Sequence, residues 1–243
     1  MSAPGLLLTR PEASAATLRT ELAQYGYAVY NAPMLDIYHH GGESAPSPHD
    51  YQAIVITSAN AAAALQTLAP PAELPVFAVG DASAQAAGMY GMRNVVSARG
   101  NSRDLRRLIT ARCKAEDSAI LYIRGRDVTG NLPESLRDSD FAVDSWIAYT
   151  AEPVAGIPEP AADSEKLATY DAVLFFSKRT ARHFAELVRG IHAEEALRHT
   201  RALCISHKVL SCIYDLPWAE IHVARRPDRQ SMIALARACV PVH

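Results

Sequence analysis

Short apolar runs alternate with helix-like stretches along this 243-residue chain, and the pattern occurs twice. The run AIVITS at 53–58 and the run AVLFFS at 172–177 both end in a serine, and a helix-like segment follows each. Further apolar runs follow in both copies, at 76–83 and 95–102 in the first and at 202–209 and 221–228 in the second. Apolar runs of this length between helical segments predict parallel strands in β-α-β units. We therefore expect two similar domains.

Counting elements suggests how the two copies divide the chain. A β-α-β segment at 5–30 precedes the first copy, and extra strand and helix follow it at 119–149. The simplest closed arrangement gives the N-terminal segment to the C-terminal copy. The domains would then be 1–35 plus 150–243, and an inserted 39–147, with linkers near 36–38 and 147–151. The proline-rich stretch 151–165 is expected to be a connecting loop.

The expected fold class is α/β. It has two similar domains with parallel sheets flanked by helices, joined by a two-stranded β-ladder. Ligands of parallel α/β sheets bind outside the carboxyl ends of the strands. Two such domains predict an active site in the inter-domain cleft.

Composition narrows the class of protein. Hydrophobic residues make up 49% and charged residues 21% of the chain, and the net charge is −2. This balance is typical of a globular protein, and it offers no global field for nucleic acid. No apolar stretch has the length of a membrane span or a signal sequence. The four cysteines form no CxxC pair. We therefore expect a cytoplasmic monomer without disulfides, bound to neither nucleic acid nor membrane.

Residues that can bind an anion lie where predicted strands give way to helices. Helix N-termini present free N–H groups and the positive end of the dipole, which favour carboxylates or phosphates. The candidates found in this way are Arg10, Thr57, Ser58, Gly80, Asp81, Arg124, Ser177, Lys178, Ser206, His207 and Lys208. The alternative for Ser58, Ser177 and Ser206 is a purely structural role as N-caps.

Motifs for other chemistries are incomplete. The segment RGRDVTGN at 124–131 has the glycine spacing of a phosphate loop but lacks its Lys and Ser/Thr. The sequence contains no GxGxxG, no HExxH and no GxSxG. His39 and His40 lie in a polar stretch that is expected to be a loop, where a surface or packing role is favoured over metal ligation. These observations predict no cofactor and no metal.

Tyr149 ends the alternating run 141–149, where one domain crossing is expected. Its phenol can donate a proton or a hydrogen bond while neutral. Packing at the hinge is the other interpretation of this residue.

The chain resembles the uroporphyrinogen-III synthase family over nearly its full length. The matching segments, in order, are LLLTRPEASAATLRTELAQYGY, YQAIVITSANAAAAL, VFAVGDASAQAAGMYG, NSRDLRRLI, AILYIRGRDVTGNLPESL, WIAYTAEP and YDAVLFFSKRTARHF. Their order and spacing carry the resemblance more than any single motif does. The matched motifs add Asn60, Ser83 and Gly125 to the candidate substrate-binding residues.

The resemblance implies a cofactor-free lyase that acts on hydroxymethylbilane, a linear tetrapyrrole with many carboxylates, which the preceding deaminase would hand over. The enzyme closes the ring, inverts ring D and releases water to give uroporphyrinogen III for tetrapyrrole and haem biosynthesis. Tyr149 matches the tyrosine that the family places in the cleft, and it is the candidate catalytic residue.

Two positions depart from the family pattern. Where many relatives have Gly-Pro-Thr-Thr-Ala, this chain has Ser206-His207-Lys208-Val209-Leu210, and Ser83 replaces a frequent threonine. A non-catalytic two-lobed binding protein for a small polyanionic ligand is the alternative function. An α/β enzyme that acts on a nucleotide is a third interpretation, which the incomplete glycine motifs weaken.

Overall fold

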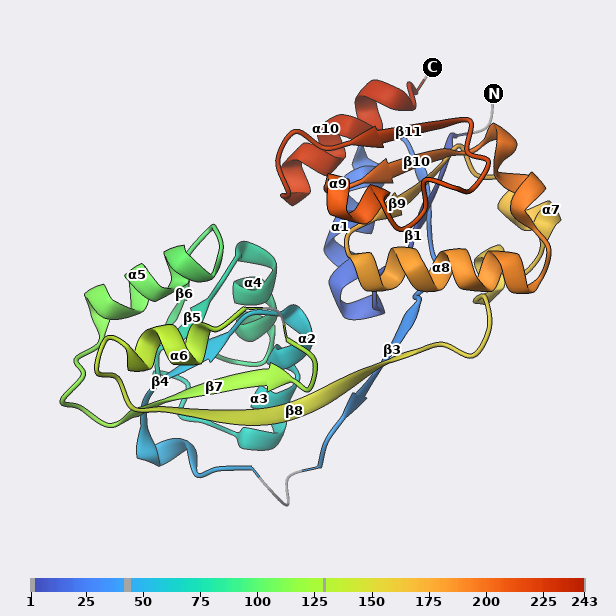
Figure 1. Cartoon of the computed structure of the whole chain (residues 1–243). Helices are drawn as coiled ribbons and strands as arrows, with labels where there is room; N and C mark the ends of the chain where they lie inside the picture. The colour runs from blue at the N-terminus through green and yellow to red at the C-terminus, as the bar shows by residue number, and fades with distance from the viewer. Residues whose placement is uncertain (1–2, 42–44, 129, 243) are drawn as a thin grey trace. The chain divides into compact units, whose positions relative to one another are not determined.

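The computed structural model describes residues 3–41, 45–128 and 130–242. The chain divides into two compact units (Figure 1). Unit 1 comprises Met1–Asp36 and Glu152–His243, and unit 2 comprises Ile37–Ala151. Unit 1 is thus formed by both ends of the chain, with unit 2 inserted between them.

Unit 1 contains a five-stranded sheet in the order β11-β10-β9-β1-β2. The strands are β1 (Gly5–Leu8), β2 (Ala28–Asn31), β9 (Ala172–Phe175), β10 (Arg201–Cys204) and β11 (Glu220–Val223). All four pairings in this sheet are parallel. The N-terminal strands β1 and β2 therefore complete the sheet of the C-terminal copy. All the carboxyl ends of these strands lie at one edge.

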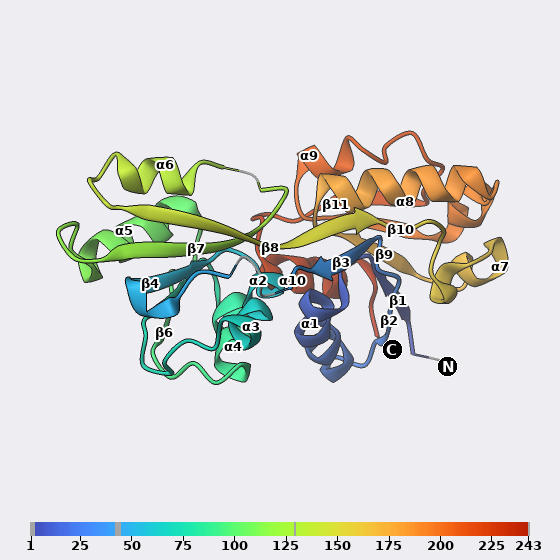
Figure 2. The same ribbon diagram turned by 90° about the horizontal axis from the view of Figure 1, so that it is seen from below.

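Helices cover both faces of this sheet (Figure 2). One face packs against α7 (Ser164–Leu167), α8 (Lys178–Gly190) and α9 (His207–Leu210). The other packs against α1 (Glu12–Gln24) and α10 (Arg229–Cys239). The 3-10 helices η3 (Glu159–Ala161) and η4 (Glu194–His199) contribute further apolar residues to the first face. Strands that are buried on both faces read as continuous apolar runs, as LLL and AVLF do here.

Unit 2 contains a six-stranded sheet in the order β3-β8-β7-β4-β5-β6. The strands are β3 (Leu35–His39), β4 (Tyr51–Ile56), β5 (Val76–Ala78), β6 (Val95–Ser97), β7 (Ala119–Gly125) and β8 (Val143–Pro153). The pairs β4–β5, β4–β7, β5–β6 and β7–β8 are parallel. The short 3-10 helix η2 (Pro48–Asp50) leads into β4.

The helices of unit 2 also lie on two faces (Figure 2). One face carries α2 (Ala59–Ala62), α3 (Ala64–Leu68) and α4 (Asp81–Met89). The other carries α5 (Ser102–Arg112) and α6 (Leu132–Arg137). A capping box fixes the start of α5, because Asn101 and Asp104 each accept a backbone N–H at the helix start. These two layers on a parallel sheet confirm the predicted α/β class.

The chain passes between the units within β3 and within β8, and these two strands are neighbours in the six-stranded sheet. The expectation of a plain loop over 151–165 is wrong in part. Strand β8 continues to Pro153, and η3 and α7 fall inside the stretch. Proline suits the first turn of a helix, and Asp163 caps α7 by accepting the backbone N–H of Lys166, so this proline-rich segment still forms helical turns.

An aromatic cluster in unit 1 offers a test of the core. The ring of Phe184 stacks on that of Trp218, with 6.0 Å between the ring centroids, and meets the ring of Phe175 edge-on at a centroid distance of 5.2 Å. Phe184 is fully buried. We expect Phe184→Ala to lower the free energy of unfolding by ~3–5 kcal/mol, measured by urea denaturation. Tyr214 is 67% exposed, so Tyr214→Ala is the control and should change it by less than about 0.5 kcal/mol. Equal losses in the two variants would contradict this account of the core.

Candidate functional site

Unit 2 gathers candidate residues at the carboxyl edge of its sheet. Thr57 follows β4, Gly80 follows β5, and Arg124 and Gly125 end β7. Because the strands are parallel and adjacent, their ends share one edge. Tyr149 belongs to this group, since it is the register partner of Gly125.

A β-bulge turns Tyr149 toward one particular face. The β7–β8 register runs from Arg124↔Ile147 to Gly125↔Tyr149, so β8 has one extra residue at this point. Strict alternation would put Tyr149 on the face opposite Trp146. The extra residue instead places it with Trp146 in the core that α2, α3 and α4 cover. Bulges of this kind redirect a side chain and are common next to active sites.

Gly125 makes room for the ring of Tyr149. A Cβ atom at Gly125 would lie 2.7 Å from Cε2 and Cζ of that ring. Tyr149 is 9% exposed, and its hydroxyl has no hydrogen-bond partner among the described residues. No described residue therefore accepts the phenolic proton. Gly125, a predicted substrate-binding residue, has a visible role in positioning Tyr149.

Two histidines lie near Tyr149, and the first of them belongs to a strand. His39 ends β3, and its ring centroid is 6.1 Å from that of Tyr149. Burial, and then the neighbouring His40, lower the pKa of His39. His40 contacts Thr150 through Nε2 and Oγ1 at 2.9 Å. His39 is exposed and packs beside Tyr149, as expected for a surface or packing role, but it ends a strand instead of lying in a loop.

Thr57 is held by a tyrosine that the sequence analysis did not select. Thr57 Oγ1 lies 3.0 Å from the hydroxyl oxygen of Tyr122, which is 4% exposed. Burial raises the pKa of Tyr122, while its bond to Thr57 and the charge of Arg124 lower it. Tyr122 thus stays neutral at physiological pH. Its position on the same face as Thr57 follows from the pairing Val55↔Tyr122.

Some of the remaining candidates of unit 2 already have hydrogen-bond or ion-pair partners within the protein, and others do not. Ser58 caps α2 by accepting the N–H of Asn60 at 3.2 Å. Asn60 is 9% exposed, and its Oδ1 is buried without a partner in the described part of the chain. Asp81 pairs with Arg99 at 3.6 Å at the start of α4. Gly80 is the N-cap of α4, and Ser83 is buried within it.

Arg124 folds back over the turn that follows β7. Its Nη1 donates to the carbonyl oxygens of Gly125 at 3.4 Å and of Arg126 at 3.2 Å. The first of these bonds is long. The guanidinium is half-buried and keeps further N–H groups for a ligand.

Unit 1 has its own set at the corresponding edge. Arg10 follows β1, Ser177 and Lys178 follow β9, and Ser206, His207 and Lys208 follow β10. Lys178, His207 and Lys208 are exposed. Ser177 caps α8 by accepting the N–H of Thr180 at 3.1 Å. Ser206 is the N-cap residue of α9 but makes no capping bond with its side chain.

The N-cap interpretation therefore holds for two of the three serines. The hydroxyls of Ser58 and Ser177 already accept a backbone N–H, although each can still donate its proton. The hydroxyl of Ser206 makes no capping bond, so it can both accept and donate a hydrogen bond.

Arg10 has an unusual environment for a cation. Its guanidinium carbon lies 4.6 Å above the ring of Phe176, and no acceptor is within hydrogen-bond distance among the described residues. Burial, followed by the charge of Arg229, lowers the pKa of Arg10 to about 10. Arg10 thus remains protonated at neutral pH. Neither Phe176 nor Arg229 was among the residues predicted from the sequence, although Phe176 stands two residues after Leu174 on the same strand face.

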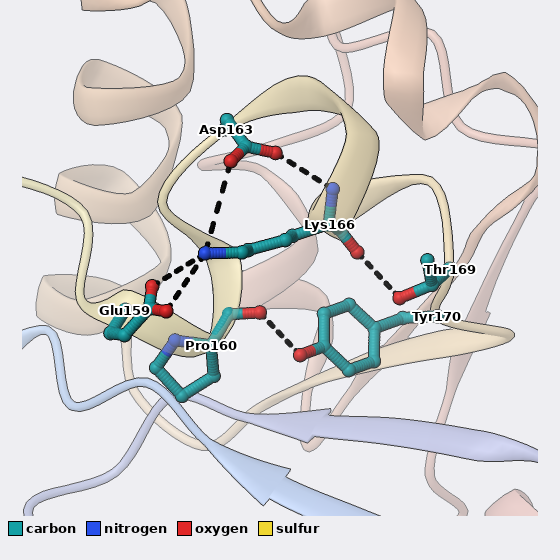
Figure 3. Close-up of polar contacts among 6 residues, drawn as sticks. All are labelled: Glu159, Pro160, Asp163, Lys166, Thr169 and Tyr170. Carbon is teal, nitrogen blue, oxygen red and sulfur yellow. Dashed lines mark hydrogen bonds and ion pairs between the residues drawn. The ribbon is translucent and has the colours of Figure 1, made fainter.

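A cavity of about 1000 Å³ lies at the opposite, amino-terminal edge of the unit 1 sheet. Residues that line it include Gly5, Tyr30, Lys166, Tyr170, Asp171 and Arg201. Lys166 Nζ bonds both carboxylate oxygens of Glu159, at 2.8 and 2.7 Å (Figure 3). Asp171 accepts the N–H of Gly5 at 2.7 Å, and Arg201 pairs with Glu220 at 3.4 Å.

Lys166 and Arg201 at this cavity thus already pair with carboxylates, and Asp171 accepts a backbone N–H. Tyr170 also donates its hydroxyl to the carbonyl of Pro160, as Figure 3 shows. Despite its volume, the cavity offers fewer free groups for an anion than the carboxyl edge does.

Two features are absent from the described ranges. They contain no cluster of three or more His, Cys, Asp or Glu side chains able to hold a metal ion. No helix in them is both long and apolar enough to cross a membrane.

Comparison with known proteins decides the family. The family model for uroporphyrinogen-III synthase HemD matches residues 16–234. The chain belongs to the uroporphyrinogen-III synthase family. Members of this family are hydro-lyases of tetrapyrrole biosynthesis. Comparison with curated proteins gives no match.

Solved structures support the same fold. Uroporphyrinogen-III synthetase from Helicobacter pylori is 15% identical, with a TM-score of 0.60, and the match covers 98% of this chain and 99% of that one. A mutant uroporphyrinogen III synthase from Thermus thermophilus is 14% identical over 97% of this chain and 98% of that one, with a TM-score of 0.49. At these identities the first match shows the shared fold, and the second adds nothing to the argument.

The close contact of Gly125 with Tyr149 predicts a steric effect. In Gly125→Ala the new methyl group must displace the ring, so we expect the free energy of unfolding to fall by ~1–3 kcal/mol. Gly88→Ala is the control, because nothing lies within 4 Å of its added Cβ, and it should be neutral or slightly stabilising. Urea denaturation measures both. An unchanged Gly125→Ala protein would mean that Tyr149 moves freely.

The raised pKa of Tyr122 predicts a late titration. In the folded protein its phenolate should form only above the ordinary value of about 10. Folding raises the pKa of the Tyr122 phenol. The contribution of Tyr122 to stability is therefore complete below the ordinary pKa and is lost as the pH rises through the pKa of the folded protein. The measurement is the ultraviolet absorbance difference between wild type and Tyr122→Phe across alkaline pH. A titration at or below the ordinary value would contradict the burial.

Proposed function

We propose that this chain is an active uroporphyrinogen-III synthase. It converts hydroxymethylbilane into uroporphyrinogen III, with inversion of ring D and loss of water. The observation that carries the proposal is the match of the family model to most of the chain. The carboxyl edges supply the groups that such a substrate needs.

The substrate carries many carboxylates, and its pyrroles carry N–H donors. Carboxylates are matched by the cations Arg10, Arg124, Lys178 and Lys208 and by the hydroxyls of Thr57 and Ser206. A pyrrole N–H is matched by the buried, unpartnered Oδ1 of Asn60. We infer that the remaining predicted residues (Ser58, Gly80, Asp81, Ser83, Gly125, Ser177 and His207) shape the same binding edges.

Tyr149 is the proposed acid. Its phenol lacks a partner among the described residues, so it can donate its proton to the departing hydroxyl group of the substrate. The pyrrole nitrogen pushes the hydroxyl out as water, which leaves an azafulvene, and the pyrrole N–H proton then replaces the proton that Tyr149 gave. The electron-rich ring D attacks the azafulvene carbon, so the protein needs no nucleophile of its own.

Orientation decides which isomer forms. The bilane closes without inversion when no enzyme holds it, giving the I isomer. The enzyme must therefore bind the chain in the geometry that leads through the spiro intermediate. This requirement fits a site with many spread-out binding groups and a single proton donor.

The test is the isomer ratio. Freshly generated hydroxymethylbilane is mixed with the protein, the products are oxidised, and the I and III porphyrins are separated. Predominant III isomer is expected. Formation of the I isomer alone, at the rate seen without protein, would leave the non-catalytic polyanion-binding alternative.

Loss of the phenol at Tyr149 should slow the reaction while the fold remains. We expect Tyr149→Phe to reduce the rate of III formation by ~10²–10⁴-fold, the range for a lost general acid. Tyr90→Phe is the control, since Tyr90 is 42% exposed in the same unit. Initial rates measure the effect, and circular dichroism checks the fold. A Tyr149→Phe enzyme with wild-type kinetics would exclude Tyr149 from the mechanism.

A further inference from the structure

Strand register explains why Arg10 and Phe176 meet. Leu8 of β1 and Leu174 of β9 are register partners, and both belong to the core that α1 and α10 cover. Arg10 and Phe176 stand two residues further along each chain, so the alternation places them on the same face, just beyond the strand ends. The guanidinium carbon of Arg10 lies 4.6 Å above the Phe176 ring. The ring therefore supports a flat, oriented cation at the carboxyl edge.

Arg229 brings a second cation to the same face. It is the first residue of α10, and its Nη2 contacts Oε1 of Glu21 on α1 at 3.2 Å. Its Nη1 is buried and has no hydrogen-bond partner in the described part of the chain, and neither does Oε2 of Glu21. The pair thus makes a single contact instead of the two-bond fork that arginine and carboxylate usually form. The Nη1 group of Arg229 therefore has unused N–H donors at a buried position.

Nearby carboxylates are engaged elsewhere. Asp228 accepts the N–H of Ser231 at 2.7 Å and pairs with Arg226 at 3.3 Å. Glu12, at the start of α1, pairs with Arg19 at 3.0 Å and accepts from Asn31 at 2.7 Å. Neither of these groups contacts Arg10 within the described residues.

Two cations close together at a buried position carry an energetic cost. Burial and the charge of Arg229 lower the pKa of Arg10 to about 10. Folding thus disfavours the protonated form of Arg10 at every pH below that value, and the protein carries this cost at neutral pH. An anion bound to both arginines would remove it, because it would supply acceptors and opposite charge.

We propose that Arg10, Phe176 and Arg229 form a subsite for one carboxylate group of a ligand. The planar guanidinium of Arg10 binds the carboxylate through two N–H groups, and the unpaired Nη1–H of Arg229 binds it from α10. In its link to catalysis this inference rests on the proposed function, where the carboxylate is an acetate or propionate arm of hydroxymethylbilane. Arg229 and Phe176 then position the substrate without touching the reacting atoms.

A direct test uses sodium propionate as the probe. The side-chain Nε–H signals of the arginines are followed by NMR, with sodium chloride at equal ionic strength as the reference. Saturable shifts at Arg10 and Arg229 are expected with propionate alone. In Arg10→Gln the Arg229 shift should weaken, and in Arg229→Gln the Arg10 shift should weaken. Shifts that grow without saturation and equal those in chloride would overturn the subsite.

A control variant and a second anion test whether the propionate response is specific to this site and to carboxylates. Arg237 also lies over an aromatic ring on α10, 4.5 Å above Tyr25, but it is exposed. Arg237→Gln should leave the propionate response unchanged, and a loss there would contradict the assignment. Saturation by inorganic phosphate at lower concentration than by propionate would overturn the choice of a carboxylate.

Stability separates a binding role from a structural one. Arg10→Met keeps an apolar contact with Phe176 and removes the charge. We expect the Tm of the unliganded protein to stay or to rise, while the propionate response is lost. A fall in Tm would show that the charge supports the fold, which contradicts the proposal.

The steady-state constants KM and kcat test the link between this subsite and catalysis. In an enzyme that forms the III isomer, Arg229→Gln should raise KM by at least about tenfold, as expected for a lost bond to a charged group, with kcat nearly unchanged. Arg229→Lys retains the charge next to Glu21 and tests whether the fork geometry matters; it should raise KM less. An unchanged KM in Arg229→Gln would overturn the catalytic link. Failure of the wild type to form the III isomer would reject the proposed function, and the propionate titration would still decide the subsite.

Discussion

Parallel strand pairing is the constraint on which the rest of this structure depends. It sends all the strand ends of each sheet to one edge, and most helices of each unit begin there. Residues from distant parts of the sequence, such as Arg10 and Ser177, therefore follow neighbouring strands. Both copies of the sequence pattern repeat this arrangement with different side chains. In the proposed function, the chemistry rests on polar residues placed just beyond apolar strands.

Several of these polar groups are less satisfied than folding alone would favour. Asn60 has a buried oxygen without a partner among the described residues, and Arg10 and the Tyr149 hydroxyl, whose polar atoms are not fully buried, also lack a hydrogen-bond partner there. Buried polar groups without partners lower stability. The placement of these three residues at the carboxyl edges is the basis for the proposal that these edges bind a ligand with both carboxylates and N–H donors. At the amino-edge cavity of unit 1, by contrast, the side chains of Lys166 and Arg201 are paired with carboxylates.

The sequence predicted the α/β class and the strand-to-helix sites because these follow from apolar runs and local caps. It could not predict the bulge in β8, which depends on the pairing with β7 and changes the face of Tyr149. Tyr122 and Phe176 look like core residues in isolation, and only the register places them against Thr57 and Arg10. The position of Arg229 depends on the packing of α10 on α1, which the sequence pattern does not reveal. Helical turns within 151–165 were missed because proline was taken to indicate a loop.

The most direct test of the account is to map where the ligand binds. Backbone amide signals of the protein would be recorded by NMR with and without uroporphyrinogen III, kept reduced. The account predicts shifts at the carboxyl edges, in the first turns after β4 and β9 and around Arg10 and Gly125, with little change at Gly5 and Asp171. Shifts concentrated around Gly5, Tyr170 and Asp171 would put the ligand in the amino-edge cavity and contradict the central claim.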